Sequence, residues 1–240
     1  MAWLLPPWRI ISVRADFTDE VNGHMNTECK ITEQMLDALR EELRGTMSEK
    51  RYRHTVEVER MVARLGALYA PDFLMQLRAA ALLHDITKEF SLQTQLQILQ
   101  KFGIMTYYSD EISPKTLHAR TAALLIPEQY PAFADPTVIE AVRWHTTGRA
   151  GMSICEKLVY LADYIDLSRT FPDCVALRQM FWDADPAAMD ADARESHLRA
   201  VLLSSYDRTV LALLEEGALI SHETMLARNE LVEQIRRSES

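Results

Sequence analysis

Apolar residues recur every three or four positions in one segment after another from Thr32 onward, and this period constrains the fold more than any other feature of the sequence. Such spacing is typical of helices that bury one face. The sequence shows no hairpin signal, and glycine supplies only 7 of its 240 residues, which disfavours a sheet with tight turns. We therefore predict an all-α protein built as a helical bundle.

Capping residues predict where several of these helices begin. Ser153 and Glu156 form a capping-box pattern ahead of an apolar run, and Asp135 before Pro136 gives a second start signal. Asp185 before Pro186 likewise predicts a long helix that continues toward Glu216. The other expected helices begin near Thr32, Ser48, Asp72, Ser91, Ser113 and Ser221.

The first 26 residues show no helical period. We expect a poorly ordered extension there, or a misassigned start with Met25 as the true initiator. Residues 27–237 are expected to form a single domain, which is long enough for a sizeable core. No apolar run approaches the roughly 20 residues that span a bilayer, so we expect no membrane segment.

The charge and the cysteines limit the partners and the compartment. A net charge of −9 disfavours broad binding to nucleic acid or to an anionic membrane, so we expect neither partner. Cys29, Cys155 and Cys174 are far apart and form no C-x-x-C pair, which indicates no disulfide framework and fits a reducing cytoplasm. The oligomeric state stays open, with a homodimer as one alternative.

Several apolar stripes end in a side chain that can bind a metal. The stripe through Leu77 and Ala81 reaches His84 in its last turn, and Asp85 follows at once. Asp163 lies in the middle of an apolar helix, where a carboxylate cannot easily reach water. Six groups share this inward placement: His54, His84, Asp85, His118, His145 and Asp163.

Each of these residues alone has an ordinary explanation. A histidine on an apolar helical face is more often a hydrogen-bonded core residue than a ligand, and a His-Asp pair arises by chance in many proteins. Together they favour one shared cation, because separate buried polar groups would each need a partner of their own. Imidazole and carboxylate suit iron, manganese or zinc, so we expect one or two such ions.

The order of these residues resembles the HD-domain superfamily of metal-dependent phosphohydrolases. The more specific motifs resemble the YqeK-type family, whose members are symmetrical bis(5'-nucleosyl)-tetraphosphatases that split diadenosine tetraphosphate into two ADP molecules. The resemblance covers roughly 47–220 and is carried by four stretches, 50–54, 82–88, 143–149 and 156–165. It implies an HD-domain helical bundle and a small dinucleoside polyphosphate substrate.

The resemblance also implies roles for the residues that match the family's motifs. Metal positions match His54, His84, Asp85 and Asp163, with iron as the expected ion. Nucleotide-binding positions match Arg51, Asp85, Ile86, Thr87, Lys88, His118, His145, Thr146, Asp163 and Arg169. A further contact strip falls near Arg208 and Thr209, after a segment, 181–196, that is longer than the family pattern.

Catalytic roles are expected for Asp85, Lys88, His118 and His145. A bound cation lowers the pKa of water from about 15.7 toward roughly 7, which provides a nucleophile at neutral pH. His118 and His145 either hold phosphate oxygens and protonate the leaving group or bind a second metal. Lys88 and Arg169 neutralise the charge that builds on the phosphoryl oxygens.

The same ligand set fits several other functions. A related hydrolase could act on deoxynucleoside triphosphates, on guanosine tetraphosphate or on a cyclic dinucleotide, although no Gly-Tyr-Pro signature of the last class follows the core. A di-iron oxygenase would use six such ligands, but the basic residues near the ligand set argue against it. A non-catalytic nucleotide sensor on the same helices is a third class.

Overall fold

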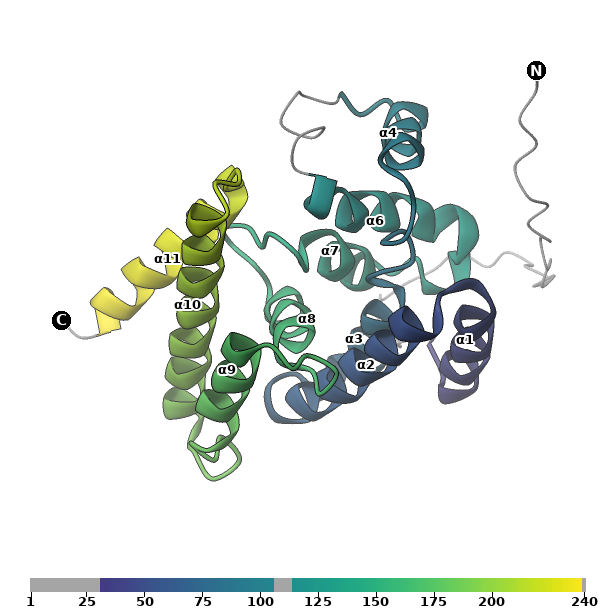
Figure 1. Ribbon diagram of the computed structural model, residues 1–240. Coiled ribbons are helices and arrows are strands. Elements are labelled where there is room, and N and C mark those ends of the chain that lie inside the picture. The colour runs from purple at the N-terminus through teal and green to yellow at the C-terminus, as the bar shows by residue number, and fades with distance from the viewer. Residues whose placement is uncertain (1–30, 106–113, 239–240) are drawn as a thin grey trace, which may run out of the picture.

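The computed structural model describes residues 31–105 and 114–238, and within these ranges the chain is helical without a strand (Figure 1). The predicted all-α fold is confirmed. The α-helices are α1 (Glu33–Thr46), α2 (Glu49–Tyr69), α3 (Leu74–Leu83), α4 (Leu92–Lys101), α6 (Leu117–Gln129), α7 (Pro136–Trp144), α8 (Ile154–Ile165), α9 (Pro172–Trp182), α10 (Ala191–Glu215) and α11 (His222–Ser238). The extension predicted over 1–26 lies outside the described residues, and the domain limits 27–237 stay a prediction.

Side-chain caps begin most of these helices where the sequence predicts. The Ser153 hydroxyl accepts a hydrogen bond from the Glu156 amide, and the Glu156 carboxylate accepts one from the Ser153 amide, so the capping box is complete. The Asp135 side chain accepts from the Thr137 amide ahead of Pro136. Four further predicted caps, Thr32, Ser48, Ser91 and Ser221, also accept backbone hydrogen bonds, whereas the start predicted at Ser113 lies outside the described residues.

The long helix predicted to begin at Asp185 and Pro186 begins later, so that prediction is wrong. Asp185 has a φ of 50°, and its amide and carbonyl belong to a tight turn between α9 and α10. Asp190 caps α10 instead, because its carboxylate accepts from the Ala193 amide at 2.8 Å. Two Asp start signals therefore compete within six residues, and the second one begins the helix.

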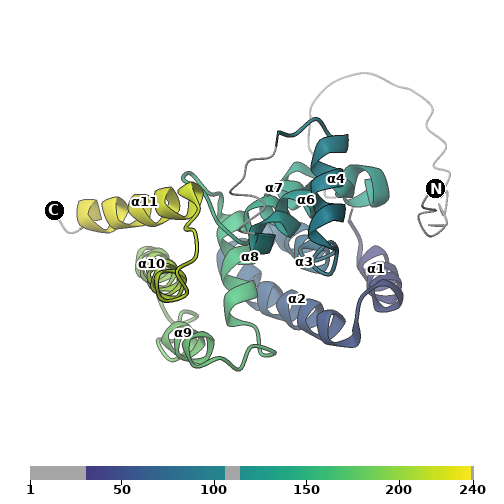
Figure 2. The same cartoon turned by 45° about the horizontal axis from the view of Figure 1, so that its top comes forward.

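The centre of the molecule is formed by α2, α3, α7 and α8, which pack against one another, with α6 against α7 (Figures 1 and 2). Leu82, Leu83, Val142 and Leu161 are fully buried there. Because α3 and α8 are mostly apolar and bury most of their residues, they occupy the middle of the bundle, whereas the more polar α1 buries one face and lies at its margin. The chemistry-bearing helices are thus the central ones.

The C-terminal helices form a second group beside α8. Helix α10 packs against both α9 and α11, and these three lie on the side of the molecule opposite α1 in both views (Figures 1 and 2). Tyr206 of α10 is fully buried and stacks on Tyr160 of α8, with 4.7 Å between ring centroids. Among the described residues, no helix combines the length and apolar character that crossing a bilayer requires.

Candidate metal centre

Five parts of the fold bring the six predicted metal-compatible residues into one buried cluster. His54 comes from α2, His118 from α6 and Asp163 from α8, whereas the other three lie at helix ends. His84 and Asp85 follow α3, and His145 follows α7. The four imidazoles form a chain, with centroids 5.4 Å apart for His54 and His84, 4.9 Å for His84 and His145, and 5.0 Å for His118 and His145.

The helix ends fix the orientation of two imidazole rings. His84 Nδ1 donates to the Ala81 carbonyl oxygen at 2.6 Å, and His145 Nδ1 donates to the Val142 carbonyl oxygen at 2.7 Å. Both carbonyls lie three residues earlier, where a helix end leaves acceptors without an amide partner. A ring that donates from Nδ1 keeps a lone pair on Nε2 when it is neutral. Both Nε2 atoms face the cluster, ready to bind a cation.

Two groups of ligand atoms are close enough to share an ion. One is His54, His84 and Asp163, and the other is His84, Asp85 and His145; within each group the atoms lie within 4.8 Å of one another. His54 Nε2 is 3.0 Å from Asp163 Oδ1 and His84 Nε2 is 3.8 Å from it. Neither buried nitrogen makes a hydrogen bond of regular geometry. Two buried imidazole nitrogens without hydrogen bonds that converge on a carboxylate oxygen fit a divalent cation.

Asp85 lies between the two groups and points one oxygen to each side. Its Oδ2 is 3.3 Å from His84 Nε2 and 3.7 Å from His54 Nε2. Its Oδ1 is 3.2 Å from His118 Nε2 and 3.8 Å from His145 Nε2. A carboxylate placed in this way can contact one ion or bridge two. His145 belongs to one of these groups, so both alternatives given for it from the sequence, phosphate contact and binding of a second metal, stay open.

Burial and charge set the protonation of the cluster. Burial raises the pKa of Asp85, but the nearby rings of His84 and His118 more than offset this and hold it well below its usual value. Burial lowers the pKa of His118 and lowers that of His145 strongly, so both rings are neutral near pH 7. Burial also opposes the charge on His54, yet the neighbouring carboxylates of Asp163 and Asp166 raise its pKa to about 9.

Three basic side chains border the cluster. Arg51 of α2 forms an ion pair with Asp85, and Arg169 donates to both the carbonyl and the carboxylate of Asp163. Lys88 Nζ lies 3.2 Å from His118 Nε2, and its burial lowers its pKa. Arg51 and Arg169 thus pair with the two carboxylates of the cluster, and guanidinium groups are well suited to bind phosphate oxygens.

The remaining predicted contacts near the cluster divide into two kinds. The Thr146 hydroxyl lies 3.1 Å from His145 Nε2 and 3.2 Å from His118 Nε2, so it is part of the cluster. The buried Thr87 hydroxyl instead donates to the His118 carbonyl oxygen at 2.8 Å and ties the turn after α3 to α6. Ile86 is half-buried and packs against the core.

Arg208 and Thr209, which were expected to contact the nucleotide, and Arg149, which lies in the matched stretch 143–149, bond elsewhere. Arg208 forms an ion pair with Asp173 at 2.6 Å, and the Thr209 hydroxyl donates to the Ser205 carbonyl oxygen. The structure places neither of them in contact with the cluster, and their nucleotide role stays a prediction. Arg149 pairs with Glu156 at 2.7 Å and so stabilises the start of α8.

Comparison with known proteins supports a metal-binding cluster independently of its geometry. The profile of the HD domain matches residues 51–168, which include all six cluster residues. The symmetrical bis(5'-nucleosyl)-tetraphosphatase of Halalkalibacterium halodurans is 30% identical over 190 residues, which cover 78% of this chain and 91% of that protein. The chain belongs to the HD-domain family. HD domains bind divalent metal through histidine and aspartate, which the cluster supplies.

Two more relatives extend the resemblance. The enzyme of the same name from Bacillus subtilis is 28% identical over 186 residues, which cover 78% of this chain and 91% of that protein. A crystal structure from Clostridium acetobutylicum, described as a predicted HD superfamily hydrolase involved in NAD metabolism, is 29% identical with a TM-score of 0.71. It covers 82% of this chain and 97% of its own. The predicted resemblance to symmetrical tetraphosphatases and the HD-domain bundle are confirmed.

Sequence reasoning missed two polar residues that touch the cluster of this HD domain. Asp166 is fully buried directly after α8, and Ser168 lies 3.1 Å from His54 Nδ1 through its hydroxyl. The only available signal was an aspartate that ends an apolar helix and lies three residues before Arg169. That signal is weak, because helix ends commonly carry aspartate.

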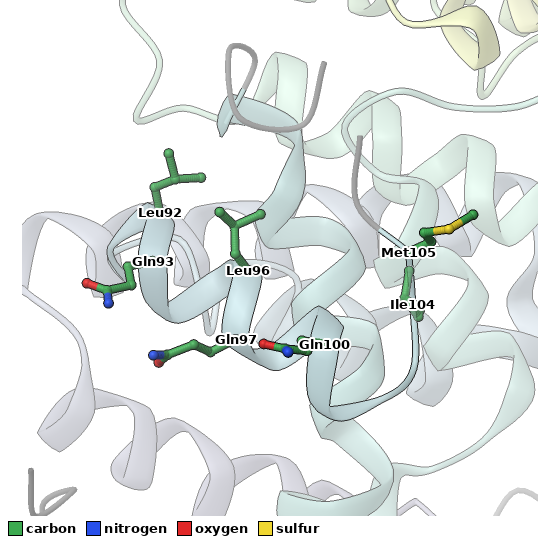
Figure 3. Close-up of a pocket in the computed structure, with 7 residues that line it drawn as sticks. All are labelled: Leu92, Gln93, Leu96, Gln97, Gln100, Ile104 and Met105. Atoms are coloured by element: carbon green, nitrogen blue, oxygen red, sulfur yellow. The ribbon is translucent and has the colours of Figure 1, made fainter. Parts of the chain in front are cut away.

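One prominent hollow lies away from the metal-compatible cluster. It has a volume of 820 Å³ and lies on α4 and the residues that follow it (Figure 3). Its lining consists of Leu92, Gln93, Leu96, Gln97, Gln100, Ile104 and Met105, which include no titratable side chain. The hollow contains no member of the cluster, so it is not the chemical site.

Proposed function

We propose that this chain is a metal-dependent hydrolase that cleaves diadenosine tetraphosphate and related dinucleoside polyphosphates symmetrically, releasing two ADP molecules. The convergence of two ligand groups on His84, with Arg51, Lys88 and Arg169 around them, is the observation that supports it most. Relatives that carry the name of this activity span most of the chain. Both lines point to hydrolysis of a phosphoanhydride at a cationic site.

His54, His84, Asp85 and Asp163 are the residues proposed to hold the ion. A divalent ion bound there supplies Lewis acidity toward a phosphoryl oxygen and toward water. The donor set of imidazole and carboxylate fits iron, manganese or zinc, and we propose iron. Metal analysis of protein purified without added metal would identify the native ion.

The surrounding side chains bind and neutralise the polyphosphate. Arg169 and Arg51 can each offer paired donors to phosphate oxygens once a substrate competes for their carboxylate partners. Lys88 is held beside His118 and presents a single compact charge. Positive charge fixed in a partly buried site is worth more than in water, because water does not screen it.

His118 and His145 complete the proposed catalytic set. Their Nε2 atoms lie 3.0 Å apart, and Thr146 and Asp85 are next to them. Because burial keeps both rings neutral, His118 Nε2 can accept a proton from attacking water and return it to the departing ADP. The same neutral lone pairs could bind a second ion instead.

The proposal also covers the cellular compartment and the oligomeric state of the protein. Cys155 and Cys174 are buried free thiols, which fits the cytoplasm that we propose as the location. A homodimer stays a prediction, and size measurement by light scattering would test it.

Product identification tests the proposed function directly. Protein reconstituted with iron or manganese is incubated with diadenosine tetraphosphate, and the products are separated by anion-exchange chromatography. Two ADP molecules per substrate support the proposal, whereas ATP plus AMP indicates a different cleavage. Deoxynucleoside triphosphates and guanosine tetraphosphate are run in parallel, and faster turnover of either would replace the substrate assignment.

A further inference from the structure

The turn after α8 places two polar side chains against the outer face of His54. His54 Nδ1 lies 3.1 Å from the Ser168 hydroxyl and 3.4 Å from Asp166 Oδ2. Asp166 is fully buried, and no role follows for it from the family motifs in this sequence. A buried carboxylate is costly unless it interacts with charged or donating groups.

Hydrogen bonding within the turn determines which way the Ser168 proton points. Both the Ser168 amide, at 2.7 Å, and the Ser168 hydroxyl donate to Asp166 Oδ1. The hydroxyl oxygen is therefore free to accept, and its neighbour is His54 Nδ1. Asp166 Oδ2 has no hydrogen bond of regular geometry within the turn and also faces that nitrogen. Two acceptors thus face one ring nitrogen.

This arrangement keeps a proton on His54 Nδ1, so Nε2 is the nitrogen that would offer its lone pair when the ring binds a cation. An acceptor at Nδ1 selects that tautomer and fixes the ring plane, which is the usual arrangement around a metal-bound histidine. His84 and His145 achieve the same result with a helix carbonyl. His54 cannot, because it lies within α2, where the carbonyls bond to helix amides. Its acceptors must come from another element.

A half-buried arginine holds this turn in place. Arg178 of α9 donates to the Ile165 carbonyl at 2.7 Å, to the Arg169 carbonyl at 2.7 Å and to the Asp166 carbonyl. These bonds satisfy acceptors that the end of α8 leaves open. The Asp166 carboxylate therefore sits on a turn whose backbone is fixed at three points.

We propose that Asp166, acting through Ser168 and directly, is a positioning residue for His54. It sets the His54 tautomer and ring orientation, and so prepares Nε2 for the cation. The inference rests on the proposed function only in treating His54 as a metal ligand. Asp166 Oδ2 also lies 3.4 Å from Arg169 Nε, so the same carboxylate borders the proposed phosphate-binding guanidinium.

Metal affinity, measured without substrate, tests the proposal. Co²⁺ is titrated into the metal-free full-length protein and binding is followed by calorimetry and by visible absorption. We expect Asp166→Asn to weaken Co²⁺ binding by roughly 10- to 100-fold. Ser168→Ala removes one acceptor and leaves the Asp166 carboxylate, so its effect should be smaller. Asp183→Asn, at an exposed carboxylate after α9, is the matched control and should bind as wild type does.

A second measurement separates positioning from a purely structural role. In Zn²⁺-loaded protein labelled with ¹⁵N-histidine, the His54 Nδ1 proton should be visible and should exchange slowly with solvent. Asp166→Asn and Ser168→Ala should both accelerate its exchange. Unchanged Co²⁺ affinity and unchanged proton exchange in both variants would overturn the proposal, even if their unfolding temperatures fell. If Asp166→Asn does not fold, Ser168→Ala decides by the same two readouts.

The outcome for the proposed function is read separately. Failure of the wild-type protein to bind Co²⁺ would remove the metal site and this inference together. Normal binding in wild type and in both variants would remove this inference alone. Tight, Asp166-dependent binding without release of ADP from diadenosine tetraphosphate would leave the inference standing and remove the proposed substrate.

Discussion

Gly148 lies so close to Tyr206 that a β-carbon on the glycine would come within 1.8 Å of the tyrosine hydroxyl oxygen. Gly148 also has a φ of 63°, in the region that favours glycine. The loop that carries Thr146 is therefore fitted around a buried ring of α10. A second contact fixes the same loop, because the Thr224 hydroxyl of α11 donates to the Thr147 carbonyl oxygen at 3.0 Å.

Gly148→Ala should destabilise the protein strongly. The added methyl group meets both the hydroxyl and the ring of a fully buried tyrosine, and the backbone angle adds strain. We expect a loss of roughly 2–4 kcal/mol in the free energy of unfolding. Urea denaturation measures it. Gly45→Ala is the control, since Gly45 is exposed in α1 with nothing near its β position, and it should be neutral or slightly stabilising.

The Cys155 thiol should resist alkylation in the folded protein. It is 3% exposed, and burial, with Glu156 and Asp135 nearby, raises its pKa to about 11. At pH 8 only about one such thiol in a thousand is ionised, and the thiolate is the reactive form. Iodoacetamide labelling followed by peptide mass spectrometry checks this, with protein unfolded in guanidinium as the reactive control. Rapid labelling of folded protein at pH 8 would contradict the buried placement.

Glu59 should contribute more to stability than a surface carboxylate does. It is buried in α2 and accepts from Arg40 Nε at 2.7 Å and from Arg78 Nε at 2.9 Å, which joins α1 and α3 to α2. Glu59→Ala leaves two partly buried guanidinium groups without this partner and should cost roughly 3–5 kcal/mol. Glu33 binds the same two arginines from an exposed position. Glu33→Ala should cost less than about 1 kcal/mol, and equal losses would contradict the difference.

The sequence predicted the helices and the cluster well because both depend on local patterns. A histidine at the end of an apolar stripe must face the core, so His84 and His145 could be placed without knowing how α3 and α7 pack. The capping box at Ser153 and Glu156 is equally local. Patterns within one helix turn were sufficient for these residues.

Local sequence patterns did not predict the contacts between different helices and turns. Arg149 lies beside cluster residues in the sequence but pairs with Glu156, and Asp166 meets His54 across more than a hundred positions. The start of α10 was misplaced because Asp185 and Asp190 offer equally good cap signals, and only the turn geometry after α9 decides between them. Such choices depend on tertiary packing, which a single sequence does not reveal.

His84→Ala should weaken metal binding strongly while the helices remain. Its Nε2 belongs to both ligand groups, so its loss removes a ligand from each. We expect metal affinity and hydrolysis to fall by more than about 100-fold, beyond the effect of losing an outer-shell partner. Plasma mass spectrometry gives the metal content, and circular dichroism gives the helical content. His197→Ala is the control, because His197 lies in α10 and bonds to the Phe181 carbonyl oxygen.

His145→Ala distinguishes one ion from two. His145 belongs only to the group with His84 and Asp85, so a two-ion site should lose one equivalent of metal in this variant. A one-ion site held by His54, His84, Asp85 and Asp163 should keep its full equivalent. Metal stoichiometry at saturation measures the difference.

Arg169→Ala should weaken nucleotide binding far more than metal binding. Its guanidinium is about one-third exposed and contacts Asp163, which places it between the proposed ion and solvent. Each hydrogen bond to a charged group is worth about 1.5–3 kcal/mol, so kcat/KM should fall by roughly 10- to 150-fold. Arg169→Lys should restore little, because a single ammonium cannot offer paired donors.

In contrast, Arg149→Ala, which removes the pairing with Glu156, should lower stability without raising KM. Parallel measurement of Co²⁺ affinity completes the comparison, and an equal loss of metal and nucleotide binding in Arg169→Ala would show that its main role is to hold Asp163 in place.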